Sequence, residues 1–377
     1  MLSAALALAL AAAPGAAPAS GPPLDVARPV VHDVTMSVDV APARDVLALL
    51  AGSPDASAAL KRLRASRPFA VALSRNGANP EDVLGRLVSV AAGTPDPLLS
   101  GYSRRAAIFS KVLDAFETDG TPGAMVQARR VAALLPATRP VTARLRVVPL
   151  FGLGGFDDVV AEPDGETLWL FADLPRLAPD GPAEADPREV VLSLLRTAAS
   201  KSWESLFDPF RKPPAWPPTK EADFDLLLAR TVRDGPATMF LFPDEFFPLG
   251  TMFEDPIRRS FARWNEAAES LLAPDAKEEA RRRALSAVTP PGDFWSRHAA
   301  VVGAKMTETI LQRAGAARYL EALAAGPRAV VALYVEVSKK TKEPSLGKAA
   351  RKALEAAPPK PAEVAPPKSP GTAPPAS

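Results

Sequence analysis

Apolar and polar residues follow two periods along this chain, and these periods predict helices on both sides of a small sheet. Residues 32–40 alternate between apolar and polar, which is typical of a short strand. Residues 105–116 instead place apolar side chains on one helical face. Alternation returns at residues 141–150 and 167–173, which we predict to be strands, with a Gly-rich loop over 151–165. The pattern predicts an α+β fold that is mostly α-helical.

Capping residues indicate where several helices begin and end. Asn79 followed by Pro80 predicts a helix that continues to about Ala91. Asp186, Pro187 and Glu189 form a capping-box-like start for a helix over 187–207. Prolines and glycines are expected to end helices, which predicts further helices over 42–52, 105–116, 122–135, 220–234, 255–271, 292–314 and on both sides of Gly326-Pro327 as far as Val337.

The first residues indicate export. An apolar run over 2–13 precedes Ala17-Pro18-Ala19, which resembles a signal-peptidase cleavage site. We therefore predict a signal peptide over 1–20, a Pro-rich linker over 21–31, and a periplasmic or extracellular location. No later stretch approaches the length of a transmembrane helix, and the chain has no cysteine for a lipid anchor or a disulfide.

The chain is predicted to consist of a globular part followed by a basic C-terminal segment. The predicted globular domain covers 32–337, with an N-terminal helical part over 32–138 and a core part over 139–337. Residues 338–377 are rich in Pro, Ala and Lys and are predicted to form a disordered tail that begins with a short helix over 346–357. Such a tail either contacts an anionic cell envelope or is a solvated terminus. No interleaving of basic and aromatic residues indicates a nucleic-acid partner.

The residues available for catalysis are few. The chain holds two histidines, His32 and His298, whereas catalytic zinc sites usually include at least two histidine ligands. His32 lies near the linker, and His298 is expected to be a half-buried, hydrogen-bonded side chain. A serine hydrolase needs a base, and two histidines leave few candidates for that role.

Other polar motifs have simpler explanations. Ser200, Lys201 and Ser202 do not have the Ser-x-x-Lys spacing. The acidic pairs Asp157-Asp158 and Asp244-Glu245 are expected to be solvated or capping residues, and the glycines at 152–155 lack the helix that a phosphate loop requires. The aromatic residues over 239–253 are expected to form a wall of the core or of a cleft.

Four segments in this order resemble a family of bacterial secreted zinc-dependent peptidases of the gluzincin kind. They are the strand and helix at 36–52, the strand–loop–strand unit at 145–174, the helix at 226–240 with Asp234-Gly235-x-Ala237, and the segment 301–334 with Gly303, Met306 and Ile310. The resemblance implies a zincin-like core, with strands near 141–150 and 167–173 packed on the former active-site helix at 187–207.

The same comparison implies that the catalytic residues have been replaced. In the family, two histidines and a glutamate form His-Glu-x-x-His on the central helix, and a later glutamate is the third zinc ligand. Here Arg196 and Ser200 occupy the histidine positions, Thr197 the glutamate position and Asp234 the third-ligand position. Of these four vestigial positions, we expect Arg196, Ser200 and Asp234 to converge under strand 167–173, with Arg196 paired to Asp234 in place of the metal.

These observations favour a catalytically inactive secreted pseudo-peptidase that binds a peptide or protein in the former cleft, or is an envelope interaction module. No cofactor is expected. One alternative is an active peptidase, either zinc-dependent with non-standard ligands or metal-independent. Another alternative is a structural envelope protein tethered by its basic tail.

Overall fold

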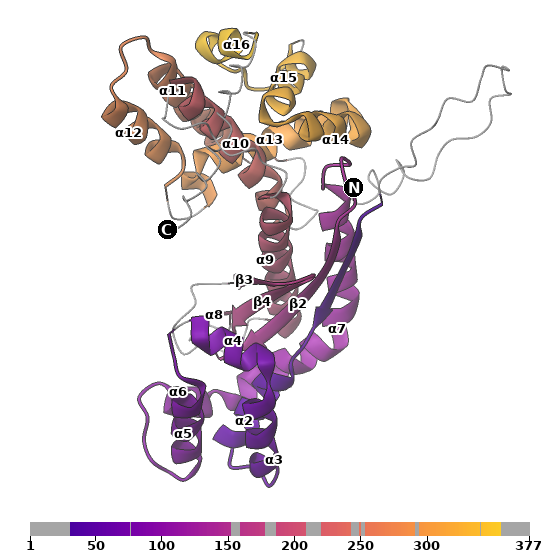
Figure 1. Cartoon of the computed structure of the whole chain (residues 1–377), viewed down its shortest axis with the longest axis vertical. Helices are drawn as coiled ribbons and strands as arrows, with labels where there is room; N and C mark the ends of the chain where they lie inside the picture. The colour runs from indigo at the N-terminus through magenta and orange to yellow at the C-terminus, as the bar shows by residue number, and fades with distance from the viewer. Residues whose placement is uncertain are drawn as a thin grey trace, which may run out of the picture.

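The computed structural model describes residues 31–75, 77–151, 159–177, 186–208, 220–242, 249, 253–290, 294–339 and 341–355. The predicted signal peptide at 1–20, nearly all of the linker and the last part of the predicted tail lie outside the described residues. The described chain is mostly helical, with one small sheet (Figure 1). The predicted α+β class, mainly α-helical, is therefore confirmed.

The sheet has four strands in the order β1-β2-β4-β3, where β1 is Asp33–Val38, β2 is Thr142–Leu150, β3 is Val159–Asp164 and β4 is Thr167–Asp173. Strands β1, β2 and β4 are parallel, and β3 runs antiparallel beside β4. The strands expected at 32–40, 141–150 and 167–173 are present. Among the described strands, β1 and β3 form the two edges of the sheet.

The expectation of a loop over all of 151–165 is wrong for β3. Gly165 has a φ of 59°, which allows the tight turn that joins β3 to β4 as a hairpin. Pro163 hides the strand pattern in the sequence, but an edge strand tolerates proline. Ion pairs from α4 (Arg67–Arg75) also hold the strand, since Arg75 contacts Glu162 at 2.7 Å.

Helices cover both faces of the sheet. Helix α4 packs over Val148, Leu150 and Phe171 on one face, while α7 (Ala106–Ala133) and α9 (Pro187–Phe207) pack on the other. The remaining N-terminal helices are α2 (Ala41–Leu50), α3 (Ala56–Ala65), α5 (Pro80–Ala91) and α6 (Leu99–Arg104). As predicted, Asn79 caps α5, since its Oδ1 accepts from the Glu81 N–H at 3.0 Å.

Helix α7 is one helix where two were predicted. It passes through Pro122 without a break, and it lies between β1 and α9. Two glycines allow this close packing: a Cβ on Gly120 would lie 3.4 Å from Val38 Cγ2, and one on Gly123 only 2.7 Å from Leu195 Cδ1. Packing on both sides therefore holds the helix across its proline, which local sequence alone does not predict.

Helix α9 leads from the sheet to the C-terminal helices (Figure 1). Its predicted cap is confirmed, since Asp186 Oδ1 accepts from the Arg188 N–H at 3.0 Å. One apolar core includes residues from the sheet, α9 and the later helices. The short helix α8 (Leu174–Leu177) lies between β4 and α9, and the later elements are α10 (Lys220–Met239), α11 (Glu254–Leu272), α12 (Glu278–Val288), η3 (Phe294–Ser296), α13 (His298–Arg313), α14 (Gly315–Ala325), α15 (Pro327–Ser338) and α16 (Lys348–Glu355).

Helix α10 does not end at Asp234-Gly235-Pro236, as the sequence predicts, but continues to Met239. The helix is buried over this last part and lies tightly against α13. Thr238 Oγ1 donates to the Asp234 carbonyl at 2.7 Å, so this side chain bonds to the backbone within the turn that contains Pro236. Tertiary packing again keeps a helix that its sequence would end.

The disordered tail does not start at Ser338. Residues 341–347 lie against α11 and α15: Tyr334 Oη donates to the Pro344 carbonyl at 2.5 Å, and the Gly347 N–H donates to Asn265 Oδ1 at 2.8 Å. Leu346 and Ala350 are buried, so α16 is part of the core. Among the described helices, none has the length and hydropathy of a membrane span.

Candidate functional site

Two of the four vestigial positions turn back along their own helix. Arg196 on α9 donates from Nε to the Leu192 carbonyl at 3.1 Å, and its Nη2 lies 3.5 Å from Glu189 Oε2. Thr197 Oγ1 donates to the Ser193 carbonyl at 3.1 Å. Both side chains therefore bond to groups that precede them on α9 itself.

Asp234 on α10 is buried and is held by arginines. Arg233 Nε donates to Asp234 Oδ1 at 2.7 Å, and Arg297 Nη2 lies 3.9 Å from Asp234 Oδ2. Burial by itself would lower the pKa of the Arg233 guanidinium. The carboxylates of Asp234, Glu204 and Asp208 nevertheless keep that pKa above its ordinary value. Asp234 therefore belongs to an ion-pair cluster between the end of α9, α10 and the start of α13.

The predicted pairing of Arg196 with Asp234 is wrong. Within the part of the chain that the structure describes, Arg196 pairs with Glu189 and Asp234 with Arg233 and Arg297. Helices α9 and α10 do pack on each other, as expected. Ser200 is buried in α9, at 5% exposure. The four positions thus do not bring their polar atoms to one site under β4.

The donor atoms at these positions do not fit zinc. A zinc site requires three or four nitrogen, sulfur or carboxylate ligands. Here the set comprises one carboxylate that is already paired, two hydroxyls and a guanidinium, which is a permanent cation. No group of three or more His, Cys, Asp or Glu side chains with metal-site geometry occurs among the described residues.

The two histidines have separate environments, and His298 follows Arg297 of this cluster directly in the sequence. As predicted, His298 is half-buried and hydrogen-bonded, with its Nδ1 3.1 Å from Ser260 Oγ. Burial lowers the pKa of His298, and the cations Arg263 and Arg259 lower it further. Burial also lowers the pKa of His32, against a hydrogen bond with the Leu135 backbone.

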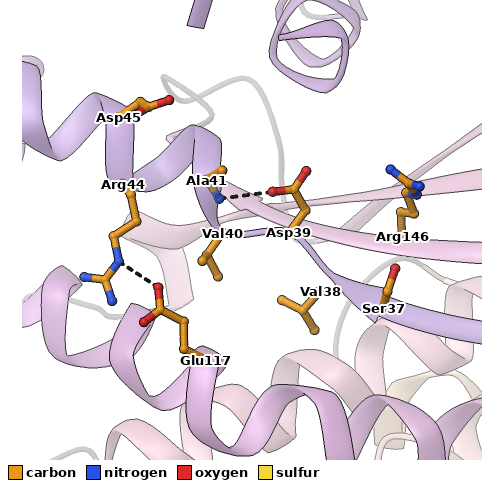
Figure 2. A pocket seen from close by; sticks show the side chains of 9 residues that line it. All are labelled: Ser37, Val38, Asp39, Val40, Ala41, Arg44, Asp45, Glu117 and Arg146. Atoms are coloured by element: carbon orange, nitrogen blue, oxygen red, sulfur yellow. Dashed lines mark hydrogen bonds and ion pairs between the residues drawn. The ribbon is translucent and has the colours of Figure 1, made fainter. Parts of the chain in front are cut away.

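A pocket opens at the end of β1, where the chain turns into α2 (Figure 2). It has a volume of about 600 Å³ and is bounded by β1, the first turn of α2, α7 and β2. Asp39 Oδ1 accepts from the Ala41 N–H at 3.1 Å, so this carboxylate satisfies the first N–H of α2. Arg44 donates to Glu117 at 3.2 Å on one side, and Arg146 lies on the other.

A second pocket, also of about 600 Å³, lies between α11 and the start of α13. Arg259, Arg263 and Glu266 line it from one face of α11, and His298 and Trp295 line the opposite side. Trp295 is held in an aromatic cluster, with ring centroids 4.7 Å from those of Phe253 and Phe294. This cluster agrees with the wall expected from the aromatic residues at 239–253.

Sequence reasoning missed both pockets. Arg259 and Arg263 are spaced by four residues on the polar face of α11, a pattern that is usually a solvated surface. Arg146 lies at an outward position of β2, opposite Ser37 of β1. These arginines are seen to line pockets only when the helices and strands that pack beside α11 and β2 are known. The acidic pairs Asp157-Asp158 and Asp244-Glu245 and the glycines at 152–155 lie outside the described residues.

The chain matches no protein-family model, no curated protein and no solved structure.

Proposed function

We propose that this chain is a catalytically inactive relative of secreted zinc peptidases that binds peptide or protein segments. The observation that carries the loss of activity is the environment of Asp234. A third zinc ligand must offer its carboxylate to the metal, but Asp234 is 6% exposed and bonds Arg233 at 2.7 Å. The arginines supply the positive charge that a metal would otherwise provide to a buried carboxylate.

Two features of the fold support the zinc-peptidase ancestry. The sheet lies over α9, which is where the resemblance expects the sheet to cover the active-site helix. In addition, the two glycine motifs of the resemblance meet in space. A Cβ on Gly235 of the Asp-Gly-x-Ala motif would lie 2.2 Å from the carbonyl carbon of Gly303 on α13.

The edge strand β1 offers a place for a bound segment. The N–H groups of Asp33 and Asp39 bond the carbonyls of Val141 and Val147 on β2, at 2.8 and 2.9 Å. In a parallel pair, alternate residues bond the same neighbour, so the backbone groups of Val34, Met36 and Val38 point away from β2. An extended peptide would pair with these groups by strand addition.

The exposed arginines of β2 favour an acidic peptide, although Asp39, Asp45 and Glu117 also line the pocket in Figure 2. Arg144 and Arg146 are exposed at alternate positions of β2, and neither forms an ion pair within the described residues. Arg146 stacks over Trp169 of the neighbouring strand β4, with its guanidinium carbon 5.4 Å from the ring centroid, and it also lines the pocket at the end of β1. A carboxylate on a peptide that pairs with β1 would form an ion pair with this guanidinium, which lines the pocket in Figure 2.

Catalytic inactivity is tested on the purified chain by zinc analysis and a peptidase assay with and without chelator. We expect substoichiometric zinc and no chelator-sensitive cleavage. Stoichiometric zinc with chelator-sensitive cleavage would overturn the proposal and favour the active-peptidase alternative. Cleavage that is insensitive to chelator would favour the metal-independent one.

Binding is tested by fluorescence anisotropy with two pools of labelled extended peptides, one rich in Asp and Glu and one rich in Lys and Arg. We expect the acidic pool to bind and Arg146→Glu to weaken it about tenfold. Arg313→Glu, an exposed charge reversal at the end of α13, is the matched control and should have little effect. Val38→Pro removes an outward N–H and should also weaken binding. Equal binding of both pools, or no effect of Arg146→Glu, would contradict the site.

A further inference from the structure

The pocket between α11 and α13 concentrates positive charge. Arg259 and Arg263 stand one helical turn apart on α11, with Ala262 between them as a small side chain that leaves the hollow open. Arg263 is balanced in part by Glu266, at 2.9 Å. Arg259 forms no ion pair among the described residues. The α11 side of the pocket therefore has a net positive charge.

His298 faces the same pocket from the opposite side. Its Nδ1 is taken by Ser260 Oγ at 3.1 Å, and Ser260 is fully buried, which fixes the ring. The other ring nitrogen, Nε2, is then the atom that a ligand would meet. His298 is also the first residue of α13, a helix without a side-chain cap, and the macrodipole adds positive potential there.

We propose that Arg259, Arg263 and His298 form a binding site for a phosphate group, a function beyond the proposed peptide binding. Two guanidinium groups and an imidazole offer more N–H donors than the two oxygens of a carboxylate accept, whereas a phosphate has three or four acceptor oxygens. Trp295 borders the pocket and presents an apolar surface beside the anion site. The ligand is either inorganic phosphate or the phosphate of an ester whose ring packs on Trp295.

The test measures binding to the full chain by calorimetry, at constant ionic strength set with KCl, using inorganic phosphate, phenyl phosphate and benzoate as probes. We expect both phosphates to bind more tightly than benzoate. Tighter binding of phenyl phosphate than of inorganic phosphate assigns the site to an ester, and equal binding assigns it to the free ion. No binding by either phosphate, or a preference for benzoate, would overturn the proposal.

Variants and histidine NMR locate the binding. Arg259→Gln and Arg263→Gln should each weaken phosphate binding about tenfold. Arg258→Gln is the matched control, because Arg258 bonds Glu254 at 2.5 Å and does not line the pocket.

Histidine NMR gives a second, independent readout of the site. The chain has two histidines, so His32 is an internal reference. Bound phosphate should raise the pKa of His298, which faces Arg259, Arg263 and Glu266, and leave that of His32 unchanged. Binding that survives both arginine substitutions, or equal shifts of both histidines, would contradict the site.

Discussion

Gly235 of α10 and Gly303 of α13 bring the backbones of their helices into direct contact. A Cβ added to Gly303 would lie 1.9 Å from the Thr231 carbonyl oxygen, and one added to Gly235 would lie 2.2 Å from the Gly303 carbonyl carbon. Neither position can accept a side chain unless the helices move apart. The crossing is buried, and Trp264 Nε1 donates to Thr231 Oγ1 at 2.9 Å beside it.

This contact predicts that Gly303→Ala destabilises the fold although alanine favours helix. Overpacking at a rigid crossing should lower the free energy of unfolding by about 3 kcal/mol. Gly85→Ala is the control, because a Cβ on Gly85 of α5 meets no atom within 4 Å. That substitution should stabilise by about 0.5–1 kcal/mol. Urea unfolding of both variants checks the prediction, and equal stabilities would contradict the crossing.

Local features of the fold could be predicted from the sequence, whereas features that depend on contacts between distant segments could not. Strands β1, β2 and β4 and the caps of α5 and α9 follow from periods and from residues such as Asn79 and Asp186, whose effects are local. Helix α10 continues through Pro236, because α13 packs against the whole of its last part. Contacts between distant segments decide such cases, and one sequence does not contain them.

The candidate site was predicted less well for a similar reason. The resemblance identified Asp234, and a buried carboxylate was correctly expected to need a cation. Its partners are the adjacent Arg233 and Arg297 on α13, whereas Arg196 bonds within α9. Which arginine reaches a carboxylate depends on helix rotation and crossing, which periodicity does not give.

Arg233 should therefore matter more to stability than Arg196. Among the described residues, Arg233→Met leaves the buried Asp234 with Arg297 alone, at 3.9 Å, and should lower the free energy of unfolding by about 2 kcal/mol. Arg196→Met keeps the buried methylenes and loses a pair whose Glu189 is 66% exposed, so the loss should stay below about 1 kcal/mol. Chemical unfolding of the two variants decides the order. A larger loss for Arg196→Met would restore the pairing expected from sequence.

A buried charge pair on α13 predicts a second large effect. Lys305 Nζ lies 2.9 Å from Glu308 Oε2, and Glu308 Oε1 accepts from the Leu249 N–H at 2.8 Å. Glu308→Ala leaves the Leu249 N–H without this acceptor and leaves Lys305 paired with Glu343 at 3.1 Å, so it should lower the free energy of unfolding by about 2–3 kcal/mol. The exposed pair Arg283–Glu279 on α12 is the control, where Glu279→Ala should cost at most about 0.5 kcal/mol. Similar losses at both sites would contradict the burial of the Lys305 pair.

Truncation distinguishes the folded part of the C-terminal segment from the rest. A chain that ends at Glu355 keeps α16, and we expect it to unfold at the same urea concentration as the full chain. A chain that ends at Val337 loses the buried Leu346 and Ala350, and also Glu343, which lies 3.1 Å from Lys305. Burial of one leucine alone contributes about 2 kcal/mol, so this shorter chain should be clearly destabilised. Equal stability of the two truncated chains would mean that 338–355 do not contribute to the core.

The two histidines predict a loss of stability at mildly acidic pH. Burial lowers the pKa of both His32 and His298 below the unfolded value of 6.5. The unfolded chain therefore binds more protons than the native chain as the pH falls through this value. The stabilising contribution is present above the unfolded pKa and is lost as the pH decreases through the lower native pKa values.

Urea unfolding at pH 7.5 and at pH 5.5, in a buffer without phosphate, measures this loss around the unfolded pKa of 6.5. We expect the double variant His32→Gln, His298→Gln to lose less stability over the interval than the unsubstituted chain. Each single variant should lie between them, because neither histidine contributes to the pKa shift of the other and their effects should add. An equal loss in all four chains would show that other groups carry the pH dependence.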